Sequence, residues 1–252
     1  MTEYFLQEFI RETKEHLKDN LCGIYLHGSL AMDCYTPGKS DVDLLIVIQN
    51  DISLNEKNSL IRKYMKLEDE FPLIHIEMSV ILERDIQDFS HPTPYALHYS
   101  RAHKERYQSN PGYICSNGHD PDLAAHFTVT YERGVGLYGK PVHEMFRPIP
   151  QEVYMDSILF DIRDAEDGII ENPVYYILNY CRVLYYIEEG VVSSKREAGE
   201  WGKVRFPHFE NLLSKALTMY SGKSSEAWQQ HELIRFSQEL AGLIGRHIQM
   251  PK

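Results

Sequence analysis

Two closely spaced aspartates near the start of the chain could bind a divalent cation. Asp41 and Asp43 open an apolar run that continues to Ile48. Because side chains alternate across a strand, both carboxylates lie on one face. Carboxylates this close repel each other but are tolerated when a divalent cation neutralises them, and magnesium favours carboxylate oxygens together with substrate phosphates. We therefore expect Asp41 and Asp43 to bind magnesium.

A glycine–serine pair precedes the aspartates. Residues 23–27 are predicted to form a short strand that ends at Gly28 and Ser29. Gly28 lets the backbone approach an anion closely, while the Ser29 hydroxyl and the following helix N-terminus supply donors for phosphate oxygens. We assign Ser40, which directly precedes the aspartates, to the same nucleotide-binding group. Asp-x-Asp alone is common by chance, so the specific signal is its place after the strand, Gly-Ser, short helix and turn.

A third carboxylate lies in residues 73–82. The even-numbered residues of this run form an apolar face, and His75, Glu77 and Ser79 lie on the other. Burying a mid-strand glutamate without a partner is costly. Its position is explained if that face points to the metal cleft, where Glu77 binds metal or takes a proton from an attacking hydroxyl. The alternative is an edge strand with a solvated face.

The elements that must position these residues suggest two domains. Two prolines within residues 147–150 mark the boundary, so we expect an α/β domain with a mixed sheet over residues 1–148 and an all-helical domain over residues 149–252. The first has predicted strands at 23–27, 42–48 and 73–82, helices at 4–18, 30–35, 54–70, 94–107 and 122–137, and a loop at 139–141. The second has predicted helices at 151–168, 173–189, 206–220 and 224–247.

Composition restricts the class of partner. The formal net charge is −11, with no basic stripe, which argues against a nucleic-acid partner and favours a cationic small molecule. No apolar run approaches the roughly 20 residues that span a bilayer. The four cysteines are scattered without a CxxC pair, and the twelve histidines form no HExxH-like pair. We expect a cytoplasmic protein with no membrane contact that exists as a monomer or weak homodimer.

The arrangement of Gly28-Ser29, Asp41-x-Asp43 and Glu77 resembles the DNA polymerase beta-like nucleotidyltransferase superfamily. Within it, most of the chain is similar to the aminoglycoside adenylyltransferases that modify spectinomycin and streptomycin. This narrower resemblance rests on LHGS at 26–29, SDVDLL at 40–45, RGVGLYG at 133–139, NYCRV at 179–183, and SK at 194–195 before GEW at 199–201. It implies a nucleotidyltransferase domain followed by a helical domain, with the active site between them.

The resemblance assigns two cations to the nucleotide. Asn172 and Pro173 are a good N-cap and first residue for the predicted helix that carries Arg182. In the resembled family, the residues matching Arg182 and Lys195 contact the triphosphate. The alternatives are that Arg182 pairs with a structural carboxylate and that Lys195 is an ordinary surface lysine.

The implied reaction transfers AMP from ATP to a hydroxyl of an aminoglycoside-type antibiotic and releases pyrophosphate, which makes the chain a candidate resistance enzyme. Asp41 and Asp43 would bridge two magnesium ions, Glu77 would be a further ligand or the general base, and Arg182 and Lys195 would balance the triphosphate charge. Two alternatives stay open: a nucleotidyltransferase that acts on a protein or tRNA, and a non-catalytic nucleotide-binding regulator.

The sequence departs from the family pattern where the acceptor is expected to bind. Family members that accept streptomycin use tryptophans in the stretches that match 97–101 and 163–168, and neither stretch holds one here. We therefore expect spectinomycin to be favoured over streptomycin. The carboxylates expected to receive the amines of the drug, each otherwise a solvated helix charge, are Asp156, Asp161, Asp164, Glu166 and Asp167.

Overall fold

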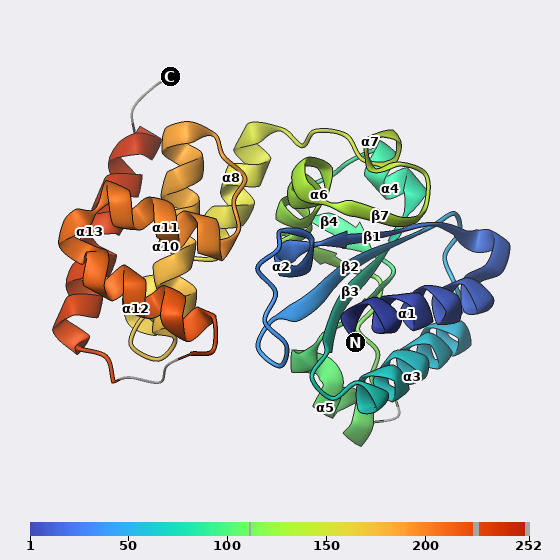
Figure 1. Cartoon of the computed structure of the whole chain (residues 1–252). Coiled ribbons are helices and arrows are strands. Elements are labelled where there is room, and N and C mark those ends of the chain that lie inside the picture. Colours follow the sequence, from blue (N-terminus) through green and yellow to red (C-terminus); the bar gives the residue numbers. More distant parts are fainter. Residues whose placement is uncertain (111, 224–226, 250–252) are drawn as a thin grey trace. The chain divides into compact units, whose positions relative to one another are not determined.

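The computed structural model describes residues 1–110, 112–223 and 227–249 (Figure 1). The chain divides into two compact units, Met1–Pro150 and Gln151–Lys252. Unit 1 is α/β, and the described residues of unit 2 form helices and connecting turns, which confirms the predicted fold class. None of the helices in the described ranges combines the length and the apolarity needed to cross a membrane.

The main sheet of unit 1 has five strands in the order β5-β3-β2-β1-β7. Its strands are β1 (Leu21–His27), β2 (Asp41–Ile48), β3 (His75–Leu82), β5 (Leu97–Tyr99) and β7 (Val135–Gly139). The central β2–β3 pair is parallel and the other pairs are antiparallel, so the sheet is mixed as predicted. A separate two-stranded sheet pairs β4 (Thr93–Tyr95) with β6 (Gly118–Asp120).

The two faces of the main sheet support two apolar clusters. Val42 and Leu44 belong to the cluster that includes residues of α1 (Thr2–Leu17) and α3 (Leu54–Glu70). Leu45 and Val47 belong to the cluster that includes Phe127 of α6 (Leu123–Arg133). Because alternate residues share a face, Asp41 and Asp43 continue the line of Leu45 and Val47 on the α6 face.

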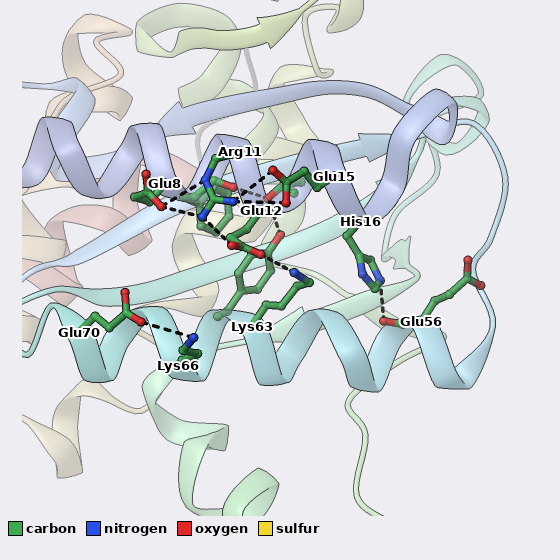
Figure 2. A network of polar contacts seen from close by, with 12 residues as sticks. Glu8, Arg11, Glu12, Glu15, His16, Glu56, Lys63, Lys66 and Glu70 are labelled. Atoms are coloured by element: carbon green, nitrogen blue, oxygen red, sulfur yellow. Dashed lines mark hydrogen bonds and ion pairs between the residues drawn. The ribbon is translucent and has the colours of Figure 1, made fainter.

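Helices α1 and α3 lie side by side, and polar contacts join them at the surface (Figure 2). Lys63 of α3 pairs with Glu12 of α1, and the His16 ring contacts the Glu56 carbonyl oxygen at 2.9 Å. Beneath them, the rings of Phe9 and Tyr64 stack with centroids 4.6 Å apart. Exposed ion pairs stabilise little, so the buried rings supply most of this attachment.

Three predictions for unit 1 are wrong in detail. The helix expected over 94–107 is replaced by β4 and β5 before α5 (Arg101–Ser109), because the edge of β3 pairs with β5 and pairing overrides local propensity. The helix expected over 122–137 ends at Arg133, and β7 follows it. The short helix α2 spans Gly28–Ala31 instead of 30–35. The remaining helices of unit 1 are η1 (Lys18–Asn20), α4 (Glu83–Gln87) and α7 (Val142–Met145).

In unit 2, helix α10 (Pro173–Glu189) packs against α11 (Lys195–Arg205), α12 (Glu210–Tyr220) and α13 (Gln230–Gln249). The predicted bounds of α10 are confirmed, while α11 was not predicted as a helix. The helix expected over 151–168 is broken into α8 (Gln151–Phe160) and α9 (Ala165–Gly168). The helix expected from 206 begins as η2 (Pro207–Phe209), and of the helix expected over 224–247, residues 224–226 lie outside the described residues.

Candidate active site

Three neighbouring strands place their polar residues in one row. The parallel register of β2 and β3 pairs Asp43 with Glu77 and Asp41 with His75, while β1 and β2 pair His27 with Asp43. Residues in register on adjacent strands are about 4.8 Å apart and face the same way. The three predicted carboxylates, Asp41, Asp43 and Glu77, are therefore neighbours at one end of the sheet and are called the acidic row below. They lie on the sheet face that packs against α6.

Gly28 lies against the carboxylate of Asp43. Its φ is +64°, and a Cβ built there would stand 1.8 Å from Oδ2 of Asp43. A side chain is therefore excluded at this turn on two independent grounds, backbone conformation and space. The glycine leaves the backbone of the turn open beside the acidic pair, as a phosphate-binding turn requires.

The two predicted serines have different surroundings. The buried Oγ of Ser29 has no hydrogen-bond partner among the described residues. A buried hydroxyl left unpaired is costly, so an incoming ligand oxygen is a fitting partner for it. Ser40 is already engaged, because its Oγ accepts a hydrogen bond from the backbone N–H of Thr36 at 3.2 Å and closes the turn before β2.

A histidine pair adjoins the acidic row, and the sequence interpretation missed it. His126 of α6 is partly buried, its Nε2 lies 3.1 Å from Asp122 Oδ2, and its ring is 4.8 Å from that of His27. Burial lowers the pKa of His126, but Asp122, aided by Glu77 and Asp43, outweighs burial and raises it to about 10. Burial and His126 hold the pKa of His27 well below its usual value. Asp122 and His126 are four residues apart on one helix face, which was the available signal.

His98 of β5 extends this group on the same face. Its Nδ1 lies 3.0 Å from Oγ of Ser79, two residues beyond Glu77. Burial, together with the neighbouring His103 and His126, lowers the pKa of His98 to about 4. His98 is therefore neutral in the folded protein at neutral pH.

This shift predicts acid sensitivity that depends on His98. Between the folded pKa of about 4 and the ordinary value of 6.5, the unfolded chain binds more protons, so stability falls as the pH drops through this window. The contribution of His98 is at most about 1.4 kcal/mol per pH unit. Urea unfolding at pH 7 and pH 5 should show a smaller pH-dependent loss in His98→Asn than in wild type. Equal losses in the two proteins would contradict the prediction.

The carboxylate of Glu68 on α3 hydrogen-bonds to the backbone at the start of β3. Its side chain is 1% exposed, and it accepts hydrogen bonds from the backbone N–H of Ile76 (2.7 Å) and the Tyr99 hydroxyl (2.7 Å), with Lys104 Nζ at 2.9 Å. Beside Ile76, the carboxylate takes the place of a strand neighbour, because β5 pairs only with residues from Met78 onward. The buried carboxylate thus fixes the backbone next to Glu77.

The cations predicted in unit 2 belong to one polar cluster. Arg182 Nη1 donates to Asn179 Oδ1 at 3.2 Å and lies 3.9 Å from Asp161 Oδ2. The Tyr175 hydroxyl donates to Asp161 Oδ1 at 3.0 Å, and Lys195 Nζ lies 4.6 Å from the centre of the Tyr175 ring. Arg182 and Lys195 are therefore linked through Asp161 and Tyr175, and these four residues with Asn179 are called the Arg182 cluster. The alternative in which Arg182 pairs with a carboxylate is also observed, with Asp161 as that carboxylate.

The five acidic residues considered for the acceptor do not form one group. Asp161 belongs to the Arg182 cluster, whereas Asp156 and Glu166 line a cavity of about 520 Å³ together with Tyr180 and Ile244. The other two, Asp164 and Asp167, are exposed helix-end charges. Asp161 is therefore the one of the five that lies beside the predicted nucleotide residues.

Each of the two units contains a region that matches a known protein family. Residues 6–91 match the nucleotidyltransferase domain, and residues 144–241 match the C-terminal domain of aminoglycoside adenylyltransferases. Over these ranges the chain is similar to the aminoglycoside adenylyltransferases. Asp41, Asp43 and Glu77 lie within the matched N-terminal region, and the cluster around Arg182 lies within the matched C-terminal region.

Curated relatives and a solved structure agree with this assignment. Spectinomycin 9-adenylyltransferase of Enterococcus faecalis is 26% identical over 220 residues, covering 84% of this chain and 85% of the relative. An aminoglycoside (3'')(9) adenylyltransferase of Klebsiella pneumoniae is 23% identical over 254 residues, covering 96% and 95%. The crystal structure of the E. faecalis spectinomycin adenyltransferase AAD(9) with ATP and spectinomycin superposes with a TM-score of 0.79 at 23% identity, covering 95% of this chain and 99% of that one, which shows the shared fold.

Proposed function

We propose that this adenylyltransferase transfers AMP from ATP to a hydroxyl of spectinomycin and releases pyrophosphate. The observation that carries the proposal is the pairing of Asp43 with Glu77 on adjacent parallel strands, with Gly28 packed against Asp43. Relatives named spectinomycin 9-adenylyltransferase, from E. faecalis and Campylobacter jejuni, support the choice of acceptor.

The residues at the site fit magnesium, and we propose two ions. Asp41 and Asp43 would hold them, with Glu77 as a further ligand, and Gly28 keeps the space beside Asp43 free of a side chain. In the described residues, no three His, Cys, Asp or Glu side chains form a ligand set on their own. Substrate phosphates and waters would therefore have to complete the ligand shell, as they usually do around magnesium, which takes one or two carboxylates. When bound, it would supply positive charge to the phosphate oxygens.

The side chains of the site divide the remaining work. The acceptor hydroxyl oxygen forms a bond to the α-phosphorus of ATP, the bond from that phosphorus to the bridging oxygen breaks, and pyrophosphate leaves. Glu77 takes the hydroxyl proton as general base. Ser29 and the Gly28 turn donate to phosphate oxygens, with Ser40 supporting the turn. Arg182 and Lys195 balance the triphosphate charge.

The proposed preference for spectinomycin rests on two missing tryptophans, the negative net charge and one carboxylate near Arg182. Residues 97–101 and 163–168 contain no tryptophan, which favours spectinomycin over streptomycin. A net charge of −11 suits a cationic acceptor, and Asp161 beside Arg182 is the carboxylate best placed to receive an amine near the nucleotide.

The direct test is pyrophosphate release from ATP and magnesium with spectinomycin or streptomycin, followed by mass spectrometry of the drug. We expect release that depends on spectinomycin and an adenylylated product, with less product from streptomycin. Release that requires neither drug, or label transferred from ATP to protein or tRNA instead, would overturn the proposal.

Lys195 offers a test of the nucleotide assignment. Lys195→Ala should weaken ATP binding about tenfold, because a charge-assisted contact to phosphate is lost. The matched control is Arg196→Ala, which removes a neighbouring exposed cation from the same helix. Calorimetric titration with ATP measures both variants. Equal affinities in the two would remove Lys195 from the site.

A further inference from the structure

A cation not assigned by the proposed function lies beside the acidic row. Arg101 is the first residue of α5, and its Nε lies 3.9 Å from Oδ1 of Asp41. The arginine side chain is 50% exposed and that of Asp41 is 34% exposed. At 3.9 Å the two atoms are beyond hydrogen-bond distance, and an ion pair this long contributes little to stability. Its position therefore calls for an explanation other than folding.

The fold holds the backbone of Arg101 at this place. Strand β5 pairs Tyr99 with Met78 of β3, so the chain leaves the sheet next to the end that carries Glu77 and Asp41. Farther along α5, Lys104 contacts the buried Glu68 at 2.9 Å, and the Tyr107 hydroxyl donates to the His98 carbonyl oxygen at 2.8 Å. The helix is thus anchored while the guanidinium at its start stays half exposed and able to change partner.

The other cations of α5 have separate partners. Lys104 is committed to Glu68, and Arg106 lies over the Tyr113 ring with its guanidinium carbon 5.8 Å from the ring centre. Arg101 is the α5 cation that contacts a proposed magnesium ligand. Because it contacts Asp41 directly, a divalent cation that binds Asp41 competes with it.

A guanidinium displaced from Asp41 has phosphate oxygens within reach. Magnesium binds carboxylate and phosphate oxygens at about 2.0–2.1 Å, so a phosphate on an ion held by Asp41 lies within about 4 Å of that carboxylate. The planar fork of arginine fits phosphate as well as it fits carboxylate. A side chain that already contacts Asp41 can therefore exchange one anion for the other with only a small movement.

We propose that Arg101 is a pyrophosphate ligand of the adenylyltransferase, which neutralises Asp41 before the nucleotide arrives and then binds the β- and γ-phosphates. The proposal rests on the proposed function, because it takes Asp41 as a magnesium ligand. It adds a triphosphate contact from unit 1 to those proposed for Arg182 and Lys195.

The test compares Arg101→Gln with Arg106→Gln by two binding measurements that need no drug. Without nucleotide, Mn²⁺ should bind Arg101→Gln about two- to fivefold more tightly, because a competing cation is lost. Pyrophosphate with magnesium should bind about tenfold more weakly, with partial recovery in Arg101→Lys. Arg106→Gln should match wild type in both measurements.

Each result decides between the proposals. Unchanged pyrophosphate affinity in Arg101→Gln overturns the assignment, and so does unchanged or weaker Mn²⁺ binding. If wild type binds neither Mn²⁺ nor pyrophosphate, the magnesium site itself is refuted, and Arg101 with it. If both bind as expected and no drug is modified, only the proposed acceptor is wrong. Urea unfolding should show nearly equal stability for Arg101→Gln and wild type, since the ion pair is long and its guanidinium is half exposed.

Discussion

Glu77→Gln should lower the rate of adenylyl transfer by about a thousandfold, within the range that a general base contributes. Glutamine has almost the same shape but cannot take the proton of the acceptor hydroxyl. The β2–β3 ladder that joins Asp43 to Glu77 is formed by backbone groups, so the strand pairing is not disturbed. ATP binding should therefore be retained. Near-normal turnover would remove Glu77 from the mechanism.

A magnesium titration separates the two roles proposed for Glu77. If Glu77 acts mainly as a metal ligand, high magnesium restores turnover to Glu77→Gln, whereas a lost base is not restored. Glu70→Gln is a suitable control, because this α3 glutamate is exposed and pairs only loosely with Lys66, at 3.7 Å. Single-turnover product formation measures transfer, and calorimetry measures ATP affinity.

The sequence predicts elements well where local signals begin and end them. Helix α3 starts at a capping box in which Ser53 and Glu56 satisfy each other's backbone N–H groups. Helix α10 has Pro173 in its first turn and ends at Gly190 in the left-handed conformation. The signals for β2 are also local: a run of branched apolar residues, and alternating polar and apolar residues at its start. The same alternation predicts that Asp41 and Asp43 share a face.

The missed features depend on partners far away in the chain. Strand β5 exists because its three residues pair with the edge of β3, and nothing within residues 97–99 signals that. Likewise, the sequence shows Glu68 only as one more charge on a charged helix. The structure shows that it accepts hydrogen bonds from Ile76 and Tyr99. The approach of Arg101 to Asp41 brings a residue that follows the edge strand β5 to one on the central strand β2, with β3 between them, and no local pattern predicts it.

Gly28→Ala should lower kcat/KM by about a hundredfold or more, because displacing a catalytic group by about 1 Å costs that much. The new Cβ would stand 1.8 Å from Oδ2 of Asp43, so either the turn or the carboxylate must move. Both are parts of the proposed site. The loss should therefore appear in magnesium and ATP binding as well as in turnover.

Gly190→Ala is the matched control for backbone strain. Gly190 has nearly the same φ, +69° against +64° at Gly28, but nothing lies within 4 Å of a Cβ built there. Each substitution forces alanine into the left-handed region at about 1 kcal/mol, measurable by urea unfolding. Only Gly28→Ala adds the collision with Asp43. If the two variants lose activity equally, the turn acts through general stability, and the close approach of Gly28 to Asp43 has no part in catalysis.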